Sequence, residues 1–416
     1  MTVIARGDQR ARLCGVAIAG VLAVLVVFGA TAASAPAGRQ ATVTITVNTL
    51  PIANALPLDL GIKKGFFAEQ GIEITKRTLQ SGNDVVLALQ NDTGEIGYLG
   101  WVPAMIARTQ GIGLTGVAAS EVEGTSESDN WQNILVKGSS SIRTPADLSG
   151  KTVAVNALKG VGEVMIKAAL KKVGVDPNSV RLLALPFPAM RSALNNGQVD
   201  AIWTPEPFMT QALTIDGARI VMAPGPVLGR FFPIGGYVSR DEWAARNPGL
   251  AARFRTAINK SLTYSQTHPD EIRELLPAAT RNVRLPIWSP VVDRGLVLQL
   301  SRYAKEYGVI STLPNLARLL PSTITSGKTL QGAVGERYIL LRIDGKAVTK
   351  LPAGKYTFVV TDSSKTQNFR LAGPGVNKTT SASGTGRSTW TVTLKKGTYT
   401  FSSSGRSSLK RTFRVT

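Results

Sequence analysis

The chain has almost none of the two residues most used in metal binding and nucleophilic catalysis. Its 416 residues include one cysteine, Cys14, and one histidine, His268. Zinc sites and Ser-His-Asp or Cys-His catalysis need histidines and cysteines grouped with partners. The sequence therefore predicts no metal, no cofactor and no enzymatic activity. We expect His268 to stand at a helix start, because Pro269 after it suits a first helical position.

Acidic residues are also scarce. The chain has 48 lysines and arginines against 27 acidic residues, a net charge of +21. Such a balance favours an anionic partner, which includes nucleic acid, a membrane surface or an anionic polymer. The 43% hydrophobic content and the length allow two or three domains with sizeable cores.

The N-terminus indicates where the protein works. Arg6, Arg10 and Arg12 precede an apolar run that ends in small residues, with an A-x-A cleavage pattern at 33–35. This is typical of a secretory signal peptide, predicted here as residues 1–37, and a retained membrane anchor is the alternative. Cys14 lies at the start of the run, so we expect no lipid on it. A secreted or extracytoplasmic location makes nucleic acid an unlikely partner.

Two sets of alternating strands and helices follow. In the first, strands at 41–48, 72–79 and 95–100 alternate with helices at 55–67 and 81–92. The second set predicts strands at 152–156, 179–185 and 199–204, with helices at 160–174 and 188–197. The order β-α-β-α-β favours parallel sheets with crossover helices. The sequence thus predicts two similar α/β lobes.

Each lobe ends in a similar unit, "ALQNDTGEIGYLGWVP" at 88–103 and "ALNNGQVDAIWTPEPF" at 193–208. We expect lobe 1 to span about 42–130 and lobe 2 about 140–235, with a cleft between them. After residue 237, the strand "GGYVSRDEW" is expected to return the chain to lobe 1. The bilobal domain is then predicted to end near Pro321.

Four segments of this domain resemble a known family: "GIKKGFFAEQGIEI", "SIRTPADLSGKTVAV", "ALNNGQVDAIWTPEP" and "NPGLAARFRTAI". They are similar to the nitrate/sulfonate/taurine-binding family of ABC-importer solute-binding proteins, which includes binders of thiamine-pyrimidine precursors. The resemblance implies a type II periplasmic-binding-protein fold, in which two lobes joined by crossing strands close on a small ligand. It also implies a membrane permease as partner.

The ligand is expected at the carboxyl ends of the strands, where helix N-termini offer free N–H groups. The predicted ligand-binding residues are Leu50, Ser81, Gly82, Asn83, Gly100, Trp101, Asn156, Gly160, Trp203 and Glu206. Each also fits a structural role as a cap, turn or packing residue. Glu206 is expected either to bind a ligand amine or ring N–H, or to pair with a basic residue or the importer. A carboxylate there favours a neutral or cationic ring compound over sulfonate or nitrate.

The sequence pattern changes in the C-terminal region, where short strands replace the alternating strands and helices. A linker is expected at 322–334, and short strands at 335–416 predict an all-β sandwich. "LPAGKYTFVVTDSSKTQNFRLAGPGVNKTTS" and "STWTVTLKKGTYTF" resemble a cupredoxin-like domain. The positions matching copper ligands hold Gln367, Ser403, Arg406 and Leu409, which make no copper site. From Leu330 onward, 15 lysines and arginines face three acidic residues. This basic domain is either a tether to anionic cell-surface polymer or lipid, or simply a solvated appendage.

The leading hypothesis is an extracytoplasmic, non-enzymatic substrate-binding subunit of an ABC importer. The alternative is a secreted surface interaction or sensor protein that reuses the binding fold, with the basic C-terminal domain as its attachment.

Overall fold

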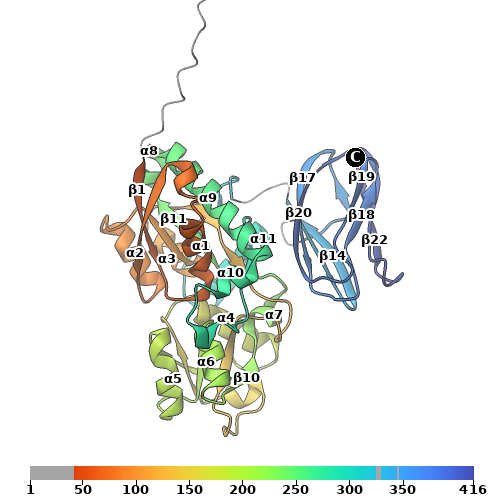
Figure 1. Cartoon of the computed structure of the whole chain (residues 1–416). Coiled ribbons are helices and arrows are strands. Elements are labelled where there is room, and N and C mark those ends of the chain that lie inside the picture. The colour runs from red at the N-terminus through yellow and green to blue at the C-terminus, as the bar shows by residue number, and fades with distance from the viewer. Residues whose placement is uncertain (1–41, 325–328, 344–345) are drawn as a thin grey trace, which may run out of the picture. The chain divides into compact units, whose positions relative to one another are not determined.

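The computed structural model describes residues 42–324, 329–343 and 346–416. The predicted signal peptide lies outside the described residues. Within the described part, no helix is both long and apolar enough to cross a membrane. Figure 1 shows an α/β region that contains the labelled elements from β1 to α11, and an all-β region that contains β14, β17, β18, β19, β20 and β22.

The first α/β lobe is built on a five-stranded sheet. Its order is β2-β1-β3-β11-β4. The strands are β1 (Val43–Thr49), β2 (Ile72–Thr78), β3 (Ile96–Gly100), β4 (Leu114–Ala119) and β11 (Gly235–Arg240). β1 pairs in parallel with β2 and β3, whereas β11 runs antiparallel to both of its neighbours. Helices α1 (Leu56–Lys63), α2 (Gly82–Gln90) and α3 (Trp101–Thr109) connect its strands.

The second lobe repeats this topology. Its sheet has the order β10-β6-β9-β7-β8. The strands are β6 (Gln132–Val136), β7 (Thr152–Val155), β8 (Arg181–Ala184), β9 (Ala201–Pro205) and β10 (Arg219–Met222). Its helices are α4 (Val161–Lys172), α5 (Phe187–Asn195) and α6 (Phe208–Thr214). β3 and β9, the strands of the two similar sequence units, occupy the same place in their sheets, so the prediction of two similar α/β lobes is confirmed.

Two segments cross between the lobes, at 120–131 and 223–234. They pair with each other, because Glu123 N donates to Phe232 O at 2.8 Å and Val122 forms an antiparallel bridge with Pro233. The first segment contains β5 (Glu121–Val122), which also pairs with β12 (Ile287–Trp288), and the second contains α7 (Pro224–Leu228). These paired segments form the hinge between the two sheets.

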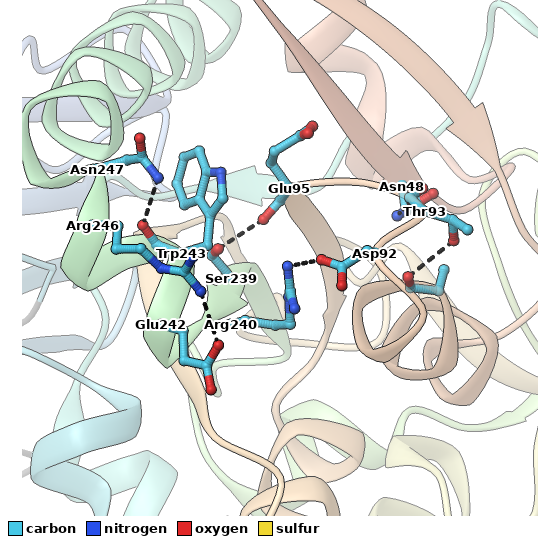
Figure 2. Close-up of polar contacts among 11 residues, drawn as sticks. Asn48, Asp92, Thr93, Glu95, Ser239, Arg240, Glu242, Trp243, Arg246 and Asn247 are labelled. Carbon is cyan, nitrogen blue, oxygen red and sulfur yellow. Dashed lines mark hydrogen bonds and ion pairs between the residues drawn. The ribbon is translucent and has the colours of Figure 1, made fainter.

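The strand β11 lies in the sheet of the first lobe, between β3 and β4, and polar contacts hold its end there. Figure 2 shows Ser239 Oγ donating to the carbonyl oxygen of Glu95 at 2.7 Å. In the same view Arg240 forms an ion pair with Asp92, which lies between α2 and β3. The return strand is therefore tied to the sheet by side chains as well as by its backbone ladder.

Helices complete the bilobal domain. They are α8 (Asp241–Arg246), α9 (Pro248–Thr267), α10 (Pro269–Arg273), α11 (Arg294–Glu306) and α12 (Leu316–Leu319). α10 begins at Pro269 with His268 at its N-cap, as predicted for the lone histidine. The His268 ring stacks on Tyr264 with ring centres 3.7 Å apart. Its role in the described structure is therefore to pack at a helix junction.

The C-terminal region forms two five-stranded sheets around a hydrophobic core of its own. One sheet contains β13 (Thr329–Gly335), β14 (Tyr338–Ile343), β15 (Lys346–Ala347), β17 (Gly354–Asp362) and β20 (Gly386–Leu394). The other contains β16 (Lys350–Leu351), β18 (Arg370–Gly373), β19 (Val376–Thr379), β21 (Gly397–Ser402) and β22 (Lys410–Val415). The fold is thus a β-sandwich.

The structure corrects one sequence-based expectation for this region, the linker, and leaves a second, the cupredoxin likeness, as a prediction. Strand β13 overlaps the segment 322–334 that was expected to be a linker. The polar and glycine residues of this segment suggested a linker, but Leu330 and Val334 are buried in the core. The positions aligned with copper ligands do lie together, since Ser403 Oγ donates to Gln367 Oε1 at 2.8 Å and Ser403 N to Leu409 O at 2.9 Å. The cupredoxin likeness stays a prediction. Among the described residues no His/Cys/Asp/Glu group is arranged for a metal ion.

Candidate functional site

A small pocket lies between the lobes, where the carboxyl ends of β3 and β9 face each other. Its cavity volume is about 50 Å³. Four aromatic side chains line it: Tyr98, Trp131, Phe187 and Trp203. The polar side chains of Asn54, Gln132 and Asn156 join them, and the described lining contains no lysine, arginine, aspartate or glutamate. The site is thus apolar, with a few hydrogen-bonding groups.

The pocket brings together six of the ten residues predicted from the sequence. They are Leu50, Gly82, Gly100, Asn156, Gly160 and Trp203. These come from both lobes, from the two helix N-termini and from the last strand of each sequence unit. The ligand-binding roles assigned to all ten residues stay a prediction.

The remaining four residues lie outside the lining, and three of them have clear local roles. Ser81 caps α2, since its Oγ accepts from Asp84 N at 3.2 Å. Asn83 is exposed on the same helix. Trp101 opens α3 and is fully buried against Gly236, where an added Cβ would lie 2.7 Å from its ring. Ser81 and Trp101 therefore stand at the starts of α2 and α3, outside the lining of this pocket.

Glu206, the fourth, is fully buried and serves as a bridge. Its carboxylate accepts from Thr210 N at 3.0 Å, from Thr210 Oγ1 at 2.8 Å and from Arg284 N at 3.0 Å. Its carbonyl oxygen accepts from Ala53 N at 2.9 Å. Burial raises the pKa of Glu206, although the hydrogen bonds from the Arg284 and Thr210 N–H groups lower it. Glu206 thus ties the second lobe to residues 53 and 284, and the argument that it disfavours an anionic ligand loses its basis.

Two buried polar groups that line the pocket have no hydrogen-bond partner. These are the Nδ2 and Oδ1 atoms of Asn54 and the Nε1 of Trp203. Asn54 is 1% exposed and Trp203 3% exposed. The Asn54 amide lies near Glu121 and helps to lower its pKa, yet the two groups do not meet hydrogen-bond geometry. These groups therefore have hydrogen-bonding capacity available to a molecule that enters the pocket.

Two helix N-termini from opposite lobes reach the same pocket. Gly82 is the first residue of α2, and Gly160 is the N-cap of α4. First-turn N–H groups have no intrahelical acceptor, and each N-terminus carries about half a positive charge. In the turn before α4, Lys159 adopts φ 54° and donates its N–H to Glu163 Oε2 at 2.7 Å. Because Asp84 and Glu163 lie in the first turns of α2 and α4, the two termini offer N–H donors to the pocket rather than a net positive charge.

The hinge beside the pocket contains two buried carboxylates that the sequence-based reasoning missed. Tyr98 donates its hydroxyl to Glu121 Oε1 at 2.7 Å, and Gln132 donates Nε2 to Glu123 Oε1. Burial raises the pKa of Glu121 to about 6 and that of Glu123 to about 8, against the hydrogen bonds they accept. Tyr98 and Gln132 therefore connect the pocket lining to titratable groups in the hinge.

The lobes are in close contact across the site. A Cβ added at Gly100 in the first lobe would lie 2.3 Å from Val161 Cγ2 in the second. The cavity volume of about 50 Å³ is well below the ~150 Å³ of an engineered cavity that accepts benzene. A small organic solute therefore needs the lobes to separate before it can enter, and the closed form that holds it is wider than the one in this structure.

Comparison with known proteins agrees with this architecture. The family described as "NMT1/THI5 like" matches residues 53–272, more than half of the sequence, and the chain belongs to that family. It is 28% identical over 204 residues to the taurine-binding periplasmic protein of Escherichia coli K12, covering 48% of this chain and 60% of that protein. It is 27% identical over 225 residues to a putative aliphatic sulfonates-binding protein of Bacillus subtilis 168, covering 53% and 65% respectively. The chain thus spans less than two thirds of the length of these relatives.

Solved structures show the same fold. The alkanesulfonate-binding protein SsuA of Xanthomonas axonopodis pv. citri, bound to MOPS, matches with a TM-score of 0.55 and 19% identity over 68% of this chain and 98% of that one. SsuA of Escherichia coli matches with a TM-score of 0.56 and 18% identity over the same shares. The α/β region therefore has the bilobal periplasmic-binding-protein fold.

Proposed function

We propose that this protein is the extracytoplasmic substrate-binding subunit of an ABC importer. It captures a small organic solute between its lobes and delivers the solute to a membrane permease. The observation that carries this proposal is the interlobe pocket, where two opposed helix N-termini meet the unpartnered groups of Asn54 and Trp203. No reaction is assigned to these residues.

The same geometry supports a ligand with a compact, acceptor-rich head. The helix N-termini, Trp203 Nε1 and Asn54 Nδ2 are all donors, and the described lining holds no charged side chain to repel an anion. The first-turn N–H groups of the two helices, which lack intrahelical acceptors, can hydrogen-bond the oxygens of such a head group. Taurine and aliphatic sulfonates, each named for one relative, satisfy this description, and the aromatic walls suit a short apolar body.

Closure of the two lobes makes the protein selective for its ligand. A ligand shifts a two-state equilibrium only by its differential affinity for the two states. A solute that contacts both lobes stabilises the closed form, because Gly82 lies in one lobe and Gly160 and Trp203 lie in the other. The permease then recognises that closed form.

Thermal unfolding with a solute panel tests the proposal. The panel contains taurine, short alkanesulfonates, nitrate and pyrimidines, each at increasing concentration. A true ligand at a hundred times its Kd adds about 2.7 kcal/mol of stability. We expect at least one compact acceptor-rich solute to raise the unfolding temperature in this way.

The variant Trp203→Phe tests whether the stabilising solute binds in the interlobe pocket. It removes the indole N–H and keeps an aromatic ring, but the smaller ring leaves a cavity in the core and lowers the unliganded stability, so the ligand shift is measured relative to the unliganded variant. The ligand shift is expected to shrink by the value of one hydrogen bond, about 1 kcal/mol. Trp390→Phe in the sandwich is the matched control. If no solute stabilises the protein, the transport proposal fails and the surface interaction or sensor hypothesis gains support.

A further inference from the structure

The second sheet of the C-terminal sandwich has an inner face and an outer face of different chemistry. Its inner face packs Leu371, Tyr399, Phe401, Phe413 and Val415 into the core. Because side chains alternate along a strand, the residues between them point outward. The outward positions of this sheet are exposed or half-buried throughout.

Strand register arranges the outward residues in rows. Lys350 pairs with Arg414, and Arg414 pairs with Thr398. At the other end of the sheet, Lys410 pairs with Ser402, which pairs with Arg370. The row between them contains Thr412, Thr400, Ala372 and Asn377. The four exposed cations of this surface, here called the basic face, are Lys350, Arg370, Lys410 and Arg414.

The basic face has no opposing charge. The five strands of this sheet contain no aspartate or glutamate. None of the four cations forms an ion pair with a described carboxylate, and Arg370 donates only to the Asn377 amide at 3.2 Å. Lysines and arginines that serve only as solvated surface are usually interspersed with acidic residues. A one-sided surface instead attracts an anion.

The spacing of the cations favours an extended anion. Arg414 and Lys410 are four residues apart on one strand, about 13 Å, and Lys410 and Arg370 are two strands apart, about 10 Å. One compact anion cannot contact all of them, whereas a chain with repeated anionic groups can. The hydroxyls of Thr398, Thr400 and Ser402 lie between the charges and can hydrogen-bond to a hydroxylated chain.

The same surface is poorly suited to enter a membrane. Interfacial membrane contacts bury tryptophan, phenylalanine or leucine beneath a basic rim. The outward positions of this sheet provide only Ala372 as an apolar side chain. We infer that the basic face binds an anionic polysaccharide and attaches the solute-binding lobes to it.

The experiment measures binding of the full chain to linear polygalacturonate, with dextran as the uncharged polymer and phosphatidylglycerol vesicles as the membrane arm. Affinity is followed between about 50 and about 200 mM salt. The test variant carries Lys350→Thr, Arg370→Thr, Lys410→Thr and Arg414→Thr. The control variant removes four exposed cations of the α/β lobes by Lys63→Gln, Arg181→Gln, Arg302→Gln and Lys305→Gln. Both variants lower the net charge equally.

We expect the protein to bind polygalacturonate and not dextran. Loss of the basic face should weaken binding by at least about tenfold and reduce the salt-dependence slope by roughly three, since each contact in a flexible polyanion contributes about 0.7. The control variant should keep the original slope. Equal losses in both variants would show attraction by net charge alone and overturn the assignment.

Two other outcomes also overturn it, namely binding to the vesicles without binding to polygalacturonate, and binding to neither. A cooperative unfolding transition at the original temperature verifies that the test variant is folded.

Discussion

Glu123 is expected to make the stability of this protein strongly dependent on pH, and Glu123→Gln should remove that dependence. The carboxyl lies in the hinge with no exposed surface, and its Oε2 has no hydrogen-bond partner. Burial raises its pKa from an ordinary 4.5 to about 8. Between those pH values the folded state holds a proton that the unfolded state has released.

The sign and size of this pH-dependent change in the free energy of unfolding follow from proton linkage. A folded-state pKa above the unfolded value gives stability that is complete below the unfolded pKa and is lost as pH rises through the folded pKa. One pKa unit corresponds to about 1.4 kcal/mol. From pH 5 to pH 8 the loss attributable to Glu123 is therefore about 4 kcal/mol. Glutamine is neutral throughout and retains an oxygen that can accept from Gln132, so its contribution does not vary.

Urea unfolding at several pH values between 5 and 8 measures this. The free energy of unfolding of Glu123→Gln minus that of the original protein should grow by about 1.4 kcal/mol per pH unit. The carboxyl of Glu121 is present in both proteins, so most of its effect cancels. Glu127→Gln, which makes the same substitution at an exposed position of the same crossing segment, is the control. A flat difference for Glu123→Gln would refute the burial argument.

Further predictions concern the contact between the lobes. Gly100→Ala places a methyl against Val161, so the closed form should lose about 1–3 kcal/mol and ligand affinity should fall by roughly 5- to 150-fold in a calorimetric titration. Adding Val161→Ala should restore most of that affinity, and an unchanged loss in the double variant would contradict the contact. Glu206→Ala leaves the Thr210 and Arg284 N–H groups without an acceptor, which should cost about 2–6 kcal/mol in urea unfolding. An effect below 1 kcal/mol would show that water replaces the carboxylate.

Sequence patterns predicted the repeating α/β order well, because each strand and helix carries its own periodicity and end signals. β2 was expected at 72–79 and lies at Ile72–Thr78, and α4 was expected at 160–174 and lies at Val161–Lys172. The helix expected at 55–67 is shorter in the structure, because α1 ends at Lys63 and Gly65 follows with φ 76°. Such signals are local, so they survive without knowledge of the tertiary structure.

The buried carboxylates of the hinge could not be predicted from the sequence, because the first crossing segment resembles a surface loop. The segment "SEVEGTSESDN" is rich in acidic and small polar residues, which are usually exposed. Only the antiparallel pairing of the two crossing segments buries Glu121 and Glu123. No residue pattern within that segment records the pairing, which joins positions more than a hundred residues apart.

The two similar sequence units also place their tryptophans differently. Trp203 lies within β9 and lines the pocket, whereas Trp101 follows β3, begins α3 and is buried beneath the sheet. Both strands are five residues long, and Trp203 corresponds in position to Tyr98, the third residue of β3, which also lines the pocket. Trp101 corresponds instead to Glu206, so the two tryptophans are not equivalent positions of the repeated unit.

A distance measurement between the lobes tests the central claim most directly. Leu87 on α2 and Ile215 at the end of α6 are exposed, one in each lobe, and Cys14 is the only native cysteine. Spin labels at Leu87→Cys and Ile215→Cys, in a Cys14→Ser background, report the separation of the lobes. A solute that stabilises the protein should narrow the distance distribution and shift it to the closed value, with Gly100→Ala opposing the shift. A distribution unchanged by a saturating, stabilising solute would contradict capture between the lobes.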